Sequence, residues 1–171
     1  MCRRFIYLPF LALLLFASSG LGDGFVRTQH LFSIERSKNG NLVRYDVRLM
    51  ANSDLAESDP VVAYWLLENG EKKPLNSVER RFAYGVSSQE KLDKNRYRIS
   101  VAAMKDREII VVRLNGSYKA FTSVDGQESI LERIYVEAEE RTFGLPKVLY
   151  IDIFGRRPGT NRSVSERVVP D

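Results

Sequence analysis

The stretch His30–Ala51, HLFSIERSKNGNLVRYDVRLMA, decides the predicted fold. Two runs rich in Leu, Ile, Val, Phe and Tyr flank Asn39-Gly40, a pair that tolerates the positive φ of a tight hairpin turn. From Val43 to Leu49, apolar residues alternate with charged ones, which is the period of a strand with one buried face. The stretch is therefore predicted to form a β-hairpin with a solvated charged face.

The same pattern recurs down the chain, with turn signals at short spacing between the runs. The eight predicted strands cover residues 31–37, 42–51, 61–67, 97–101, 109–112, 118–124, 128–139 and 147–154. Closure of such a sheet removes edges that would otherwise promote aggregation. We therefore predict a mainly β fold, an antiparallel meander forming an eight-stranded barrel or half-barrel of the calycin-like kind; the alternative is an open β-sandwich.

The third predicted strand, Val61–Leu67, is apolar on both faces and is expected to be covered on both sides. After it the hydrophobic period changes for one element. Asn76 or Ser77 can cap a helix and Gly85 can end it, so one short helix is predicted over about 77–84.

A helix of this length is not stable by itself. Val78 and Phe82 are therefore expected to pack against the sheet, which leaves Arg80 and Arg81 facing outward or towards an opening. Arginines at a barrel opening would favour an anionic head group, since each offers a planar fork of donors.

The residues near this opening form a hypothetical ligand site. Arg36 and Lys38 leave the first strand and would complete the cationic rim, while aromatic residues such as Tyr45 would line the interior. The candidate ligand-binding residues are Glu35, Arg36, Lys38, Tyr45, Tyr64, Trp65, Glu79, Arg80, Arg81, Tyr84 and Tyr97. The alternative is structural, with charged residues paired or solvated and the aromatic residues in the core.

The amino end has the order of a secretory signal peptide. Arg3 and Arg4 precede an apolar run over residues 5–16, and small residues follow, with cleavage predicted between Ser19 and Asp23. An uncleaved membrane anchor is the alternative reading of this segment. We therefore predict a signal peptide over 1–22, a single β domain over 23–157 and a flexible polar tail over 158–171.

Composition excludes several classes of site. Removal of the signal lowers the formal net charge from +4 to +2, too small for a dedicated nucleic-acid binder. It also removes Cys2, the only cysteine, so neither a disulfide nor a thiolate metal site is expected. His30 is the only histidine and no G-x-S-x-G motif is present, so we expect no catalytic triad, no zinc site and no cofactor. His30 is expected to be an exposed or capping residue.

Three blocks, LFSIERSKNGNLVRYDVRL, DPVVAYWL and GEKKPLNSVERRFAYG, resemble the signature blocks of an exported bacterial family, domain of unknown function 4833. The strongest blocks run from about Leu31 to Gly85. The resemblance implies a single secreted domain and supplies no activity, cofactor or catalytic residue. The family-like positions are Glu35, Arg36, Asn39, Asn41, Tyr45, Asp46, Trp65, Glu79, Arg80, Phe82, Tyr84 and Gly85.

Three functional hypotheses follow. The leading one is an exported, periplasmic or extracellular, non-enzymatic barrel that binds a small amphipathic or anionic ligand. The second is a structural envelope protein whose outer sheet face binds a protein partner. The third is a hydrolase that uses Glu35 and Glu79 as paired carboxylates. None of them involves nucleic acid or stable membrane insertion after signal cleavage.

Overall fold

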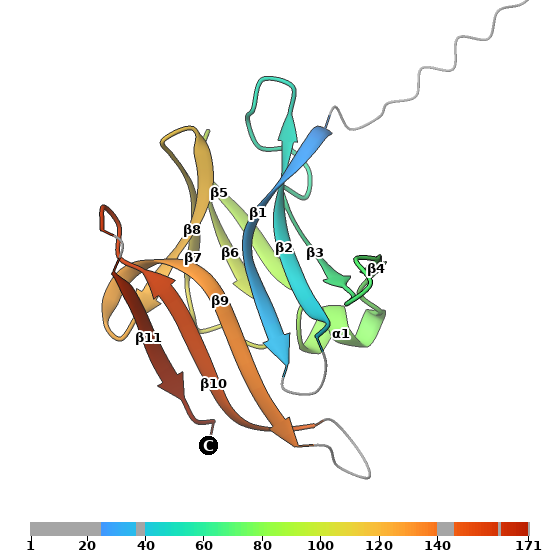
Figure 1. Ribbon diagram of the computed structural model, residues 1–171. Coiled ribbons are helices and arrows are strands. Elements are labelled where there is room, and N and C mark those ends of the chain that lie inside the picture. The colour runs from blue at the N-terminus through green and yellow to red at the C-terminus, as the bar shows by residue number, and fades with distance from the viewer. Residues whose placement is uncertain (1–24, 37–39, 140–145, 161, 171) are drawn as a thin grey trace, which may run out of the picture.

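The computed structural model describes residues 25–36, 40–139, 146–160 and 162–170, which form one curled β-sheet with a single short helix at its side (Figure 1). The predicted signal peptide and Lys38 lie outside these residues. The strands are β1 Phe25–Arg36, β2 Leu42–Met50, β3 Val61–Leu66, β4 Lys72–Pro74, β5 Val86–Asp93, β6 Arg96–Val101, β7 Ile109–Leu114, β8 Ser117–Val124, β9 Gln127–Glu139, β10 Lys147–Arg156 and β11 Ser163–Val168. The helix, α1, covers Ser77–Phe82.

The opening hairpin forms as its pattern predicts. β1 and β2 are antiparallel, and Phe32 lies opposite Tyr45 in the register. Their rings stack, with centroids 4.4 Å apart and an interplanar angle of 10°. Both side chains are fully buried, so the apolar face of the hairpin forms part of the core.

The sheet follows the order β4-β3-β2-β1-β9-β8-β7-β6-β5 and curls into an open half-barrel, which confirms the predicted half-barrel. Neighbours are antiparallel except at one place, where β1 runs parallel to β9. The first part of β9 pairs with β8, a later part pairs with β1, and β10 pairs along its length. β9 therefore joins the two halves of the sheet, and the β10–β11 hairpin extends from it off the main path.

Two glutamine side chains join strands that are not paired with each other in the sheet. The Gln29 amide on β1 accepts from the backbone N–H of Tyr118 (3.0 Å) and donates to its carbonyl (2.7 Å) on β8. The Gln89 amide on β5 does the same to Val61 on β3, at 2.8 and 3.1 Å. Each amide thus takes the place of a strand partner and satisfies a backbone donor and acceptor. The Gln89 contact joins the two arms of the curled sheet.

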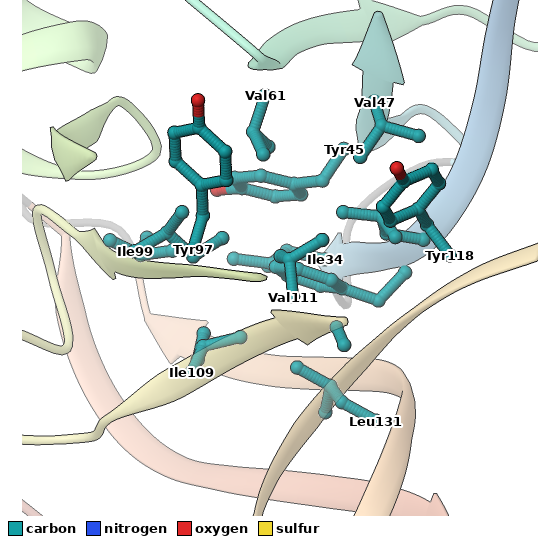
Figure 2. Close-up of a cluster of buried hydrophobic side chains, with 14 of the residues drawn as sticks. Ile34, Tyr45, Val47, Val61, Tyr97, Ile99, Ile109, Val111, Tyr118 and Leu131 are labelled. Carbon is teal, nitrogen blue, oxygen red and sulfur yellow. The ribbon is translucent and has the colours of Figure 1, made fainter. Parts of the chain in front are cut away.

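The interior is filled by the chain's own side chains. Figure 2 shows the cluster, in which labelled residues from both halves of the sheet, such as Val47 and Val111, point towards one another. Phe32, Tyr45, Val47, Ile99 and Val111 each have an exposed fraction of 0%. Such packing contributes stabilisation through burial and dispersion contacts.

The structure contains three strands beyond the eight predicted. β4 is only three residues long and fully exposed, and β5 shows the burial of an edge strand, so neither carries a strong period-2 signal. β11 lies within residues 158–171, where we predicted a flexible tail. Val164, Glu166 and Val168 alternate there with exposed residues, and β11 pairs with β10, so the prediction of a flexible tail is wrong for this segment.

The helix follows the third predicted strand, but its burial differs from our expectation. Asn76 and Glu79 form a reciprocal capping box, as the sequence indicates. Val78 and Phe82, expected to pack against the sheet, are instead 53% and 56% exposed. α1 is held by its cap and by the chain on either side, so it does not need an apolar face against the core.

Candidate functional site

A groove of about 820 Å³ lies between the outer face of the curled sheet and the β10–β11 hairpin. Residues of β7 and β8 line one wall, and residues of β10 and β11 line the other. The loop between β6 and β7, residues 102–108, lies at one end. A volume of this size falls within the usual range of small-molecule sites, about 300–1,000 Å³.

The walls of the groove are apolar. Ile110 on β7 and Phe121 on β8 are opposite each other in the register, and both are half-buried. Across the groove, Ile151 on β10 and Val168 on β11 form a second such pair. Because these side chains line the groove and belong to different ladders, two apolar surfaces face the same space.

An ion pair between Arg107 and Glu166 lines the groove beside the hairpin. Arg107, from the loop before β7, donates to both carboxylate oxygens of Glu166 on β11, at 2.8 and 3.3 Å. Arg107 also donates to the carbonyl of Ser123, and Glu166 accepts from the backbone N–H of Asp125 at 2.9 Å. We call these four residues the Arg107 clamp. The Arg107 hydrogen bond lowers the pKa of the Glu166 carboxyl against the opposing effect of burial.

The rim of the groove carries charges of both signs. Lys105, Asp106 and Glu128 are exposed there. Glu108 also lines the rim and accepts from Arg98 at 2.6 Å. Since the cation of the clamp is already paired with its carboxylate, the rim does not form the single cationic surface that a simple anion site requires.

Several of the predicted site residues meet elsewhere, around Tyr84. The Tyr45 hydroxyl donates to the Tyr84 carbonyl at 2.6 Å, and the rings of Trp65 and Tyr84 meet edge to face at 5.3 Å. Burial raises the pKa of the Tyr84 hydroxyl, Arg36 lowers it and Glu79 raises it. Tyr45 on β2 and Trp65 on β3 therefore contact the chain just after the helix, and a ligand site at this place stays a prediction.

The other predicted site residues lie apart from this cluster. Tyr97 belongs to the buried core, and Glu35 pairs with Arg133 at 2.8 Å. Arg80 and Arg81 are exposed on α1, where Arg80 donates to the Leu75 carbonyl at 3.2 Å. The ten candidate residues that the structure describes are thus divided among several separate sets of contacts.

Tyr64 belongs to a polar cluster on the outer face of β1, β2 and β3. Its hydroxyl donates to Asp46 at 2.6 Å, and Arg44 and His30 contact the same carboxylate at 2.9 and 3.1 Å. Burial of the Asp46 carboxyl by itself would raise its pKa, but these three hydrogen bonds outweigh burial and lower the pKa to about 2. The carboxylate is 2% exposed and is surrounded by its own partners, which is the arrangement of a structural ion cluster.

Sequence reasoning missed the groove, although a signal was present. Ile109-Ile110-Val111-Val112 is apolar on both faces, as is the third predicted strand. In the structure Ile109 and Val111 enter the core, while Ile110 faces the groove. A two-sided apolar run indicates a strand with a second covered surface. The other wall could not be anticipated, because β11 was assigned to a tail.

Two further features of the described part of the chain bear on its chemistry. No helix there is long and apolar enough to cross a membrane. Within the same residues, no group of three or more His, Cys, Asp or Glu side chains is arranged to hold a metal ion.

Comparison with known proteins yields one finding. A family model described as a domain of unknown function, DUF4833, matches residues 32–167, which includes both halves of the sheet and the hairpin. No curated protein and no solved structure matches the chain.

Proposed function

We propose a function from the surface of this chain, which belongs to the DUF4833 family, whose description assigns no activity. The chain is a non-enzymatic domain that binds a small amphipathic ligand in the groove between β7–β8 and β10–β11. The observation that carries this proposal is the pair of apolar walls around a space of about 820 Å³. We further propose that the protein acts after export, outside the cytoplasm, in keeping with its signal-like amino end.

The groove supports an amphipathic ligand for two reasons. Ile110, Phe121, Ile151 and Val168 provide contacts for a hydrocarbon or aromatic body, which gains free energy when its apolar surface leaves water. The rim provides charged side chains of both signs for a polar head group. Sites of this composition, apolar with a few polar groups, are typical of small-molecule binding.

In the interior the described side chains pack against one another, which favours the groove over the interior as the ligand site. Tyr45, expected to line a cavity, is fully buried and stacks on Phe32. Displacing such side chains would forfeit dispersion contacts at interior packing density. Paired-carboxylate hydrolysis also gains little support, since Glu35 is engaged by Arg133 and Glu79 by the helix cap.

Native mass spectrometry of the protein purified from its host without denaturant is the first test. We expect a mass excess that disappears on denaturation, and its value identifies the ligand. The second test uses 1-anilinonaphthalene-8-sulfonate as a probe, with displacement by dodecyl phosphate or dodecyltrimethylammonium to distinguish anionic from cationic head groups. Displacement by both amphiphiles would indicate that the hydrocarbon body carries the affinity.

Substitutions locate the bound probe. Phe121→Ser and Ile151→Ser replace one apolar residue on each wall, and each is expected to weaken probe binding about tenfold, which corresponds to about 1.4 kcal/mol. Leu149→Ser is the matched control, because Leu149 is on β10 and 39% exposed but does not line the groove. Unchanged affinity in both wall variants would show that the probe binds elsewhere and would overturn the proposal.

A further inference from the structure

The turn of the β10–β11 hairpin lies at the margin of the molecule (Figure 1), and two arginines face each other across it. The backbone N–H of Arg157 donates to the Arg162 carbonyl at 3.0 Å, which continues the antiparallel register one step beyond Arg156 and Ser163. Directly opposite residues of such a pair extend to the same face, with Cβ atoms about 4.5–5.5 Å apart. The Arg157 and Arg162 side chains therefore begin close together on one face of the hairpin.

This pair differs from the arginines within the neighbouring strands. Arg133 on β9, Arg156 on β10 and Arg167 on β11 each pair with a carboxylate, at 2.8, 2.9 and 2.7 Å. No acidic residue in the described part of the chain forms an ion pair with Arg157 or Arg162. The Nε atom of Arg157 is also shielded from solvent and has no acceptor among these residues. The two cations of the turn are therefore left without a counter-charge from the chain.

Such a pair costs stability when nothing binds to it. Like charges directly opposite each other destabilise a strand pair. A shielded donor without an acceptor also forfeits the hydrogen bond that it would make to water, so it calls for an ion or a ligand as its explanation. Because no hydrogen bond holds the Arg157 guanidinium in place, it can turn towards an anion beside Arg162. An anion that accepts from both arginines would remove both costs.

We propose that Arg157 and Arg162 bind the phosphate group of a ligand at the turn of the β10–β11 hairpin. Each guanidinium presents a planar fork of N–H donors that matches the oxygens of a phosphate. A phosphate monoester carries a charge of about −1.5 to −2 at pH 7, which balances two cations, whereas a carboxylate balances one. Neither arginine lines the groove, so the inference goes beyond the proposed function and does not depend on it.

The backbone on both sides of the turn holds the two arginines in place before a ligand binds. The Thr160 N–H donates to the Arg157 carbonyl at 3.2 Å, and the Arg162 N–H donates to the Thr160 hydroxyl at 3.3 Å. Gly159 has a φ of 72°, a conformation that glycine adopts without strain. Binding therefore orders the two arginine side chains and not the chain that carries them, which lowers its entropic cost.

Isothermal titration calorimetry of the protein purified from its host, at constant ionic strength, tests the inference. Inorganic phosphate and glycerol 3-phosphate are the soluble probes, and phosphatidylcholine vesicles containing phosphatidic acid present the same group on a lipid surface. Arg157→Gln and Arg162→Gln each remove one guanidinium. Arg81→Gln removes the same charge at an exposed position on α1. Glu132→Gln/Arg156→Gln removes the neighbouring ion pair without changing the net charge.

We expect wild type and both controls to bind phosphate with equal affinity. Arg157→Gln and Arg162→Gln should each bind it about tenfold more weakly, since each loses a charge-assisted fork of hydrogen bonds. Arg162→Lys keeps the charge without the fork and should have an intermediate affinity. Because the glutamine variants also lose the like-charge contact, neither should unfold at a lower temperature than wild type in chloride alone.

The three probes distinguish the sources of the phosphate group. Binding of both soluble probes would assign the site to a free phosphate or phosphate ester, and binding of the vesicles alone would assign it to a lipid head group. The inference would be overturned by a wild type that binds none of the probes or by unchanged affinity in both arginine variants. An equal loss of affinity in Arg81→Gln would overturn it too, because the effect would then come from net charge.

Discussion

The barrel interior and the outer groove are both apolar, but they differ in what covers them. In the interior Phe32, Tyr45 and Val111 have no exposed surface, and the Tyr45 hydroxyl has its own acceptor. In the groove, Ile110 and Phe121 stay half-buried although the hairpin stands opposite them. The interior is complete without a ligand, whereas the groove leaves apolar surface that a ligand could cover. A strand pattern rich in aromatic residues therefore indicates a packed core more strongly than it indicates a binding cavity.

Replacing one aromatic residue of the interior and one of the groove by alanine should give the largest difference in stability between the two regions. Phe32→Ala leaves a cavity in a fully buried cluster, and we expect it to lower the free energy of unfolding by about 3–5 kcal/mol. Phe121→Ala removes a half-buried ring and should cost about 1 kcal/mol. Urea unfolding measures both values.

The effects of the same two substitutions on probe binding should have the opposite order of size. Phe121→Ala should weaken probe binding in the groove, and Phe32→Ala should leave it unchanged under conditions in which the variant stays folded. Phe32→Leu is the control for volume, with a smaller loss of stability. Equal destabilisation by the two alanine variants would mean that the groove wall is part of the core. The interior and the groove would then not differ in packing.

The comparison also applies to a polar site. The buried Asp46 carboxylate is hydrogen-bonded by three side chains of the same chain, as the interior is packed by its own side chains. The pKa of Asp46 is lowered from 3.8 to about 2, so its contribution to stability is present above pH 4 to 5 and is lost as the pH falls towards 2. The shift corresponds to about 2 kcal/mol. Asp46→Asn should therefore reduce stability by about this amount at pH 7 and flatten the fall in stability between pH 5 and 2.

Urea midpoints at several pH values, compared between wild type and Asp46→Asn, isolate this effect from the other carboxyl groups. The matched control is Asp106→Asn, since Asp106 is an exposed carboxyl. Parallel pH profiles of wild type and Asp46→Asn would contradict the assignment of Asp46 as a closed structural site.

Gln89 tests how the interior is closed. Its amide makes two hydrogen bonds to the Val61 backbone, joining β5 to β3. Gln89→Leu leaves that donor and acceptor without their partners, and we expect a loss of about 1–2 kcal/mol of stability. Amide hydrogen exchange at Val61 should accelerate more than exchange at Val43 on β2. Gln127→Leu, at an exposed position, should change neither the stability nor the exchange rates.

Much of the fold could be predicted because one-sided strands carry a strong pattern. The Phe32 and Tyr45 strands and the capped helix follow from local residues. The parallel pairing of β1 with β9 could not be predicted, since register between distant strands depends on tertiary packing. Neither could the roles of Gln29 and Gln89, because a polar residue in a strand looks solvated until its backbone partner is known.

The candidate site was predictable only in part. The sequence led us to expect residues of the helix and of the first strand near one opening. Whether neighbouring side chains leave space there depends on volumes that residue types do not reveal. The groove depends on β11, whose short alternation resembles a polar tail until it pairs with β10. Val78 and Phe82 were assigned to the core because helical spacing does not distinguish a face that packs on the sheet from one that faces water.

The Arg107 clamp should give the smallest change in stability but a distinct change in the groove. Glu166→Gln keeps an acceptor for the Asp125 N–H but removes the charge that Arg107 holds. Because this pair is partly exposed, we expect a loss below about 1 kcal/mol in unfolding free energy at pH 7. Arg107 lowers the pKa of Glu166, so in wild type this contribution is present above the ordinary pKa of the carboxyl and is lost as the pH falls through the lowered value.

Probe affinity is the more informative measurement for the clamp. If Glu166 holds β11 against the sheet, Glu166→Gln should weaken probe binding roughly threefold at pH 7, about 0.7 kcal/mol. The difference between the two proteins should shrink as the pH falls through the lowered pKa of the Glu166 carboxyl. Glu132→Gln is the control, because Glu132 pairs with Arg156 away from the groove. A clamp variant with wild-type affinity would mean that β-sheet pairing alone positions the hairpin. The groove would then be as rigid as the interior, and the two regions would differ only in what covers them.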